Sequence, residues 1–404
     1  MNMTPYQKFV VAVLAFLQFT IILDFMILSP LGAILMPTLQ ISTSQFGWVV
    51  SSYAFSAGIS GFLAAGFADR FDRKKILLFF YTGFIAGTFL CAIATDFHFL
   101  LFARIVTGLF GGVVGSVVFA ITTDVFPLEM RGRVMGVVQT AFAVSQVLGL
   151  PFGLFLSNHW GWHAPFLLIV IIGVLAGAVI ALRLKPIDAH LSLPSEKTAF
   201  QHLLHTLSQP RYLQGFATTA LLATGGFLIM PFSSAFSVNN LKVTLEQLPI
   251  VYMATGVCSI IAAPLLGRMT DKGGRMKVFL MGSILSIITV LIYTNLGATP
   301  LWAVIGISIV MFVGISARMI SSSAMISAVP VAADRGAYMA VSSSIQQISG
   351  GIAAAVGGML IIQTATGPLE HFERLGYVMT ATTLITVVMM YKIDQYVQQL
   401  LNKT

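Results

Sequence analysis

Three charged side chains stand inside long apolar stretches of this sequence. Asp24 lies in FTIILDFMILSPLG, Arg104 in LFARIVTGLFGG and Arg318 in FVGISARMISSS. A charge at the centre of a bilayer costs ~2.5 kcal/mol or more, so it faces water or a partner of opposite charge. A carboxyl that binds and releases a proton there can couple proton movement to another process. We therefore predict that Asp24 is a proton-coupling residue, with a permanent ion pair to an arginine as the alternative.

A cluster of charges marks one junction between apolar stretches. Residues 69–75 read DRFDRKK, in a chain with only 9% charged residues. Lysine and arginine alone suffice to keep a loop on one side of a membrane, so the aspartates favour a further role. We expect Asp69, Arg70 and Arg73 to form a gate whose contacts exist only while one side of the protein is shut. A purely topological role for these charges is the alternative.

The composition places the chain in a membrane. Of its 404 residues 57% are hydrophobic, whereas soluble domains carry about a quarter charged residues. Twelve apolar stretches have about the 20 residues needed to cross a bilayer, and the first is too long for a signal peptide. Because no stretch alternates like a barrel strand, we predict an all-α polytopic membrane protein. The predicted spans are 8–36, 46–68, 75–95, 98–122, 132–156, 163–183, 211–237, 247–268, 276–296, 300–327, 336–364 and 374–391.

The distribution of basic residues orients these spans. If the N-terminus is inside, Lys242 and Arg374 alone lie in outside loops, and every other Lys or Arg except Arg104 and Arg318 lies in an inside loop. We therefore predict that both termini are cytoplasmic, in the inner or plasma membrane. The net charge of +8 does not indicate nucleic-acid binding, because the charges are spread over short loops. Two isolated cysteines indicate neither a disulfide nor a metal site.

The two parts of the chain resemble each other. AAGFADRFDRKK at 64–75 matches LGRMTDKGGRMK at 266–277, which places Asp271 over Asp69 and Arg275 over Arg73. MRGRVMGVV at 130–138 likewise matches DRGAYMAVS at 334–342. We predict two pseudo-symmetric six-helix bundles, residues 1–183 and 211–404, joined by a cytoplasmic linker, 184–210. Parallel repeats place a substrate site at their interface, and Arg131, Asp271 and Arg275 join the predicted gate.

These loops resemble the signature G-x-x-x-D-R-x-G-R-K of the major facilitator superfamily of transporters. The first copy has Ala65 and Asp72 where that signature has glycines. Arg104 and Gly108 match the R-x-x-x-G of the family's span 4. The G-x-P-x-G of span 5 resembles the antiporter motif of the 12-span drug:proton antiporter group, with its arabinose-efflux-like branch as the nearest match. Its residues are Gly149, Pro151 and Gly153.

The resemblance implies how these residues are arranged. Spans 1, 4, 7 and 10 of the family line a central cavity, so the three buried charges are expected to converge there. Either arginine then pairs with Asp24 or binds an anionic substrate group. Asp69 is expected to dock at the start of span 11, and the span 5 motif is expected to bend its helix and pack at the interface between the bundles. The other predicted cavity residues are Phe25, Met26, Met230 and Gln346.

The sequence thus predicts a secondary transporter that exports small amphipathic or drug-like molecules in exchange for protons by alternating access. Its partners are expected to be the small molecule, protons and the lipid bilayer, and the protein is expected to be a monomer. Export of a sugar, a metabolite or a lipid-like molecule is one alternative, and a non-transporting membrane sensor is another. No phosphate-binding loop and no nucleophile–base arrangement occurs, so neither an enzyme nor a cofactor is predicted.

Overall fold

A computed structural model describes residues 3–67, 71–188, 191, 206–331, 334–364 and 367–401. Residues 3–188 are called the N-terminal half below, and residues 206–401 the C-terminal half. Asp69 and Arg70 of the predicted gate lie outside the described residues.

Each predicted span of the N-terminal half is a helix, with ends within a few residues of the prediction. Span 5 consists of three consecutive segments, because a π-helical turn interrupts it just ahead of Pro151. Proline lacks the N–H that an α-helix needs and crowds the carbonyl four residues earlier, which is where such a turn is expected. The elements are α1 (Pro5–Leu39), α2 (Thr43–Phe67), α3 (Arg73–Ala92), α4 (Phe97–Val125), α5 (Leu128–Val144), the π-turn Ser145–Gly149, α6 (Leu150–Trp160) and α7 (Ala164–Arg183).

The C-terminal half is also helical, and span 7 is broken by a 3-10 turn at Pro231. One short antiparallel ribbon, in which Ile362 pairs with Glu370, follows α14. The elements are α9 (Pro210–Ile229), the 3-10 turn Met230–Phe232, α10 (Ser233–Asn239), α11 (Leu248–Met269), the π-turn Thr270–Gly274, α12 (Arg275–Thr294), α13 (Leu301–Ile326), α14 (Arg335–Leu360), β1 (Ile362–Gln363), β2 (Leu369–Glu370) and α15 (Phe372–Leu401).

Two helices differ from the sequence prediction. In the described part of the chain, eleven helices are long and apolar enough to cross a membrane. The remaining predicted span, α14, has 26 residues but is rich in serine and glutamine, and it packs between α2 and α9. Helix α15 extends ten residues past its predicted end at 391, because Ile393 and Val397 pack against a cluster that contains Tyr212 and Tyr338.

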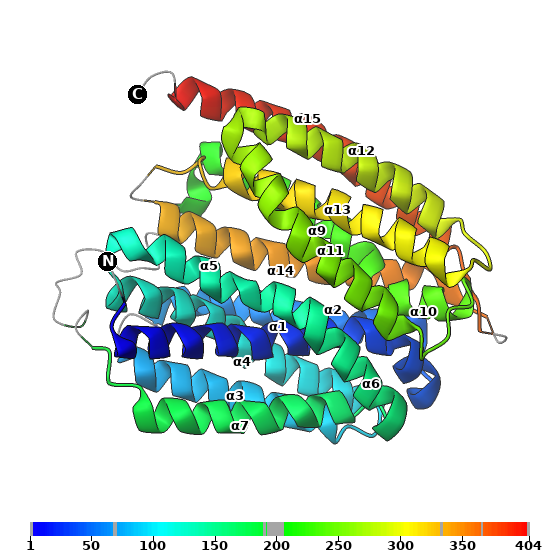
Figure 1. Cartoon of the computed structure of the whole chain (residues 1–404), viewed down its shortest axis with the longest axis horizontal. Coiled ribbons are helices and arrows are strands. Elements are labelled where there is room, and N and C mark those ends of the chain that lie inside the picture. The colour runs from blue at the N-terminus through cyan, green and yellow to red at the C-terminus, as the bar shows by residue number, and fades with distance from the viewer. Residues whose placement is uncertain are drawn as a thin grey trace.

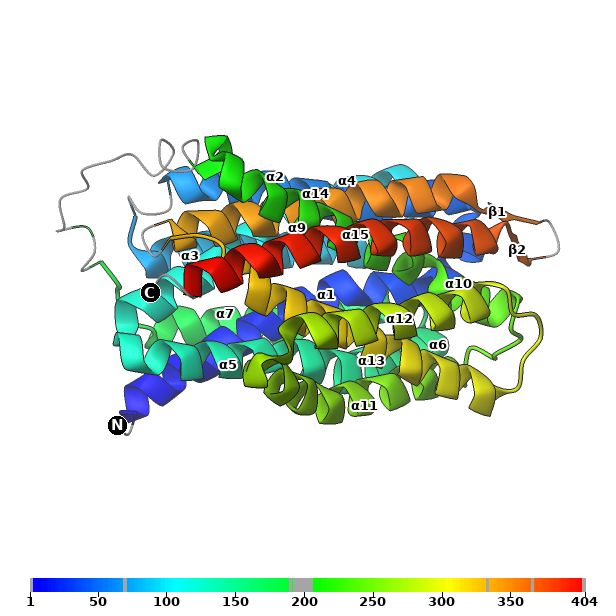
Figure 2. The same ribbon diagram turned by 90° about the horizontal axis from the view of Figure 1, so that it is seen from above.

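The helices run side by side along the long axis of the molecule. In Figure 1, α1–α7 fill the lower part and α9–α15 the upper part. Both termini lie at one end, and β1 and β2 lie at the other (Figure 2). The halves meet where α2 packs on α14, α1 on α10, and α6 on α11. The chain is therefore a multi-pass membrane protein with two groups of helices in extended contact.

Candidate functional site

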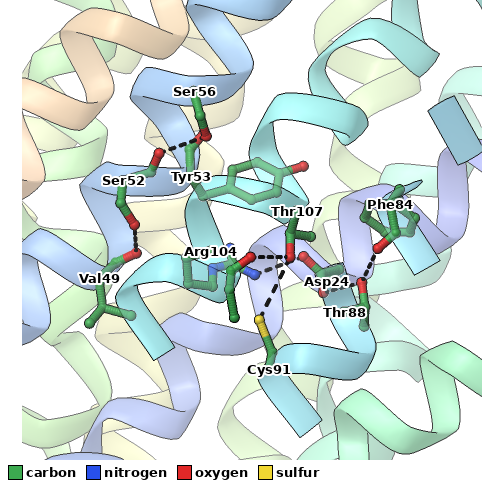
Figure 3. A network of polar contacts seen from close by, with 11 residues as sticks. Asp24, Val49, Ser52, Tyr53, Ser56, Phe84, Thr88, Cys91, Arg104 and Thr107 are labelled. Carbon is green, nitrogen blue, oxygen red and sulfur yellow. Dashed lines mark hydrogen bonds and ion pairs between the residues drawn. The ribbon is translucent and has the colours of Figure 1, made fainter. Parts of the chain in front are cut away.

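Asp24 is the only acid in α1, and it is in direct contact with Arg104 of α4. The Arg104 Nη1 donates to Asp24 Oδ2 over 2.8 Å, and the two side chains are 0% and 1% exposed (Figure 3). Charge-assisted hydrogen bonds of this length are roughly twice as strong as neutral ones. In this state Asp24 therefore faces an arginine and not water. An ion pair to an arginine is the alternative that the sequence left open.

Thr88 of α3 is the second polar partner of the carboxylate. Its hydroxyl lies 3.1 Å from Asp24 Oδ1 and 3.0 Å from the Phe84 carbonyl oxygen. A hydroxyl has one hydrogen to donate and two lone pairs that accept. Thr88 can donate to an ionised Asp24, or donate to Phe84 while accepting from a protonated Asp24. The same contact therefore satisfies both protonation states of the acid.

The aromatic ring of Tyr53 completes the site. The Arg104 guanidinium carbon lies 4.5 Å from the ring centroid, within cation–π range, and Arg104 Nε has no hydrogen-bond partner in the described structure. Arg104 thus contacts the Asp24 carboxylate and the Tyr53 ring, while Thr88 contacts the other oxygen of that carboxylate. Thr88 and Tyr53 were not identified from the sequence, because a single hydroxyl or ring inside an apolar stretch carries no distinguishing pattern.

Glycines bring the helices close enough for Arg104 to reach Asp24. A Cβ atom at Gly108 would lie 2.4 Å from the Tyr53 carbonyl oxygen, and one at Gly87 would lie 2.7 Å from the Thr107 backbone. Real side chains are not found at such distances from backbone atoms. The glycine of the R-x-x-x-G motif is therefore needed for the contact between α4 and α2, one turn from the ion pair.

The span 5 motif packs beside the same site. Cβ atoms at Gly149 and Gly153 would lie 2.6 and 2.5 Å from the terminal methyls of Leu23 and Ile27, which flank Asp24 on α1. The motif glycines therefore face α1 of their own half. The contact of span 5 with the other half is made by Gln146 and Val147 of the π-turn, which lie against Gly256 of α11, and by α6, which also packs on α11.

The third membrane charge does not join the pair. Arg318 of α13 is 4% exposed, and its guanidinium lies 5.9 Å from the ring centroid of Phe279 on α12. The structure pairs Asp24 with Arg104, and Arg318 contacts neither of them among the described residues, so its place in a shared cavity stays a prediction.

The other predicted cavity residues occupy several environments. Phe25 lies between Tyr53 and Phe227, with ring centroids 5.3 and 5.6 Å away, and so links the halves. Met26 is buried in the core, and the Met230 carbonyl accepts a hydrogen bond from the Ser29 hydroxyl. Gln346 is exposed on α14, whereas its neighbour Gln347 lines a small cavity.

That cavity, of about 40 Å³, lies between the halves, and a polar space of this size holds water. Gly112, which lines it, is two turns beyond Arg104 on α4, toward the end with the termini. Its walls come from α2, α4 and α14: Ala57, Gly61, Gly112, Ser116, Ala340, Ser343, Ser344 and Gln347.

The described gate residues make contacts within their own halves. Arg73 Nε donates to Asp124 Oδ2 over 2.9 Å, and Arg131 donates to the carbonyls of Thr123 and Phe126 at the end of α4. Asp271 lies exposed in the π-turn before α12, and Arg275 is half-buried. A gating role for these residues stays a prediction.

Hydrogen bonds join the halves at the end away from the termini. The Thr43 hydroxyl donates to the Ile361 carbonyl over 2.8 Å, and the Asn158 amide donates to the Leu245 carbonyl over 2.9 Å. The Ser234 hydroxyl donates to the Ser29 carbonyl over 2.8 Å. This end of the molecule is therefore closed by direct contacts between the halves.

Comparison with known proteins decides the family. The sequence profile of the Major Facilitator Superfamily matches residues 14–238 and again residues 215–400. The chain belongs to this superfamily. The two matches span both halves of this major facilitator protein, and the resemblance seen in its loops is confirmed at the level of the superfamily.

Relatives and a solved structure agree with that assignment. The uncharacterized MFS-type transporter YceJ of Bacillus subtilis is 28% identical over 277 residues, which are 66% of this chain and 68% of the relative. A probable sugar efflux transporter of Mannheimia succiniciproducens is 24% identical over 356 residues, 87% of this chain and 86% of the relative. The inward-facing, unoccupied structure of a bacterial homolog to the human lysosomal transporter Spinster shares the fold, with a TM-score of 0.70 and 17% identity over 98% of this chain and 97% of that one.

Proposed function

We propose that this major facilitator protein is a proton-coupled exporter of small amphipathic molecules, and that Asp24 carries the proton. The observation that supports this most directly is the buried Asp24–Arg104 pair with a two-way hydrogen-bond partner in Thr88. An ion pair holds only while the acid is ionised. Protonation of Asp24 removes its charge and leaves Arg104 to seek another partner, so proton binding and helix contact are linked in one site.

Transport requires that this site meets water from alternate sides. The halves are closed at the end away from the termini, and the small polar cavity lies between the ion pair and the end with the termini. We propose that both termini are cytoplasmic in the inner or plasma membrane, so that the cavity is the first part of the route by which the proton leaves. Separation of the halves at the opposite end would admit the next proton.

Sugar export is the second candidate. The relative that matches most of the chain, among those described above, is named a probable sugar efflux transporter. The rings of Phe25, Tyr53 and Phe227 do not separate the two candidates, because aromatic faces suit amphipathic molecules as well as sugar rings. A substrate panel with both classes separates the two.

The test is proton flux in proteoliposomes that contain the full chain and an imposed substrate gradient. The wild type is expected to move protons when an amphipathic substrate is supplied, whereas Asp24→Asn is expected to move none, because an amide cannot carry a proton. Thr20→Val is the matched control, because it removes a buried hydroxyl one turn before Asp24 that contacts Tyr81 and not the Asp24–Arg104 pair, and it is expected to keep the proton flux. Substrate-driven proton movement in Asp24→Asn equal to that of the wild type would remove Asp24 from the mechanism.

A further inference from the structure

Arg318 is a buried cation without a counter-charge. Its side chain is 4% exposed, and in the described part of the chain its guanidinium has neither an ion pair nor a hydrogen bond. Its one described polar contact is with the face of the Phe279 ring, at 5.9 Å. An arginine at such depth is a functional residue by default, since a charge in hydrocarbon is tolerated only with a partner or water.

Because Arg104 is paired with Asp24, that acid is not available to Arg318. Arg104 takes the carboxylate of Asp24, which leaves no membrane-embedded acid of α1–α15 for Arg318 among the described residues. A buried charge without its partner costs several kcal/mol, and arginine cannot lose its proton in a protein. No acidic side chain of the described residues balances this charge.

Hydroxyl groups without partners lie on the helices around Arg318. The Ser286 side chain of α12 faces Gly314, one turn before Arg318 on α13, and Thr383 of α15 lies one turn beyond Met379. Neither Ser286 Oγ nor Thr383 Oγ1 has a hydrogen-bond partner in the described structure, although both are buried. Buried hydroxyls are normally satisfied, so these two, on helices that pack against α13, are free to bind a ligand.

Helix α9 has two adjacent glycines, Gly225 and Gly226, and the first of them borders the Arg318 guanidinium. A Cβ at Gly225 would lie 4.0 Å from Arg318 Nη1 and 3.6 Å from the Met379 side chain, and a Cβ at Gly226 would have no atom within 4 Å. Four residues later α9 changes to the 3-10 turn at Met230–Phe232. Broken helices are typical of transporter substrate sites, and this break lies one turn from the two glycines.

We infer that Arg318 binds the carboxylate of an amphipathic monoanion, the substrate class of the exporter proposed above, on which this assignment rests. The guanidinium fork matches a carboxylate with two parallel hydrogen bonds. Ser286 and Thr383 supply further donors, while Phe279 and Met379 offer an apolar surface for the rest of the molecule. One cation balances one negative charge, so a dianion would leave a buried charge uncompensated.

The experiment compares acids with their neutral amides on the purified full chain. Phenylalkanoates from phenylacetate to 6-phenylhexanoate, and the corresponding primary amides, are titrated by calorimetry in detergent. The wild type is expected to bind at least one acid ten-fold or more tightly than its amide. Arg318→Gln is expected to abolish that preference, and Arg318→Lys, which keeps the charge but loses the fork, is expected to retain part of it.

A second variant keeps the test valid where Arg318→Gln does not fold. Gly225→Leu places a side chain beside the guanidinium, whose Nη1 would lie 4.0 Å from the added Cβ, without changing any charge, and it is expected to weaken acid binding ten-fold or more. Equal affinity of the wild type for every acid and its amide overturns the inference, and so does an acid preference that survives in Arg318→Gln. Binding is measured without flux, so the two proposals can fail separately. A preference for acids without proton movement contradicts the proposed function and not this inference. Proton-coupled export of amides but not acids contradicts this inference and not the proposed function.

Discussion

The Asp24–Arg104 pair makes an asymmetric prediction for stability. Removing one partner of a buried ion pair costs about 3–5 kcal/mol, because the other charge stays buried and unpaired. With a 2.8 Å contact and side chains that are 0% and 1% exposed, this pair belongs in that range. Asp24→Asn leaves a guanidinium that cannot become neutral, so a loss of about 3–5 kcal/mol is expected. Arg104→Gln leaves a carboxyl that can take up a proton, so its loss is expected to be the smaller of the two.

The measurement is the free energy of unfolding of the purified protein in mixed micelles at neutral pH, as a double-mutant cycle. The double variant Asp24→Asn/Arg104→Gln is expected to recover much of the loss, because no charge remains buried. Thr88→Val is the matched control, with an expected loss of about 1–2 kcal/mol for one hydrogen bond. An Asp24→Asn variant as stable as the wild type, or more stable than Arg104→Gln, would refute the assignment of this pair as the dominant buried electrostatic contact.

Two further predictions concern helix contacts. Asp124→Asn removes a charged partner of Arg73 and is expected to lower the free energy of unfolding by about 1–2 kcal/mol. Because Asp124 is partly exposed, the loss is expected to be smaller at high salt. A loss that does not depend on salt would contradict this prediction. Gly149→Leu is expected to abolish transport by displacing Leu23, which is next to Asp24 on α1. Adding Leu23→Ala is expected to restore flux in proteoliposomes. A double variant with no more flux than Gly149→Leu would show that the contact with Leu23 is not the cause.

Helix positions were largely predictable from the sequence because the apolar stretches have the length that a bilayer demands. The one predicted span that is not apolar enough by itself is α14, which packs between other helices and so does not need a fully apolar surface. The extension of α15 was missed because its last turns bury only Ile393 and Val397 on one face. An amphipathic helix end of this kind does not show as an apolar stretch.

The site was predictable only in part. A charge inside an apolar stretch is conspicuous, so Asp24, Arg104 and Arg318 were found from the sequence. Which arginine pairs with the acid depends on how α1 and α4 pack, and that packing is set by glycines whose role appears only in three dimensions. Thr88 has no sequence signal at all, although it is the group that can serve both protonation states of Asp24.

The contact of Thr43 with the Ile361 carbonyl has a consequence for how conditions act on the protein. Bonds from hydroxyls and amides to backbone carbonyls carry no net charge, so added salt and moderate acidity leave them intact. The opposite end, where Arg73 and Arg131 are found, responds to ionic strength and to anionic lipid headgroups. A change of ionic strength at the face with the termini is therefore expected to alter the contacts of Arg73 and Arg131, while the same change at the other face leaves the contact of Thr43 intact.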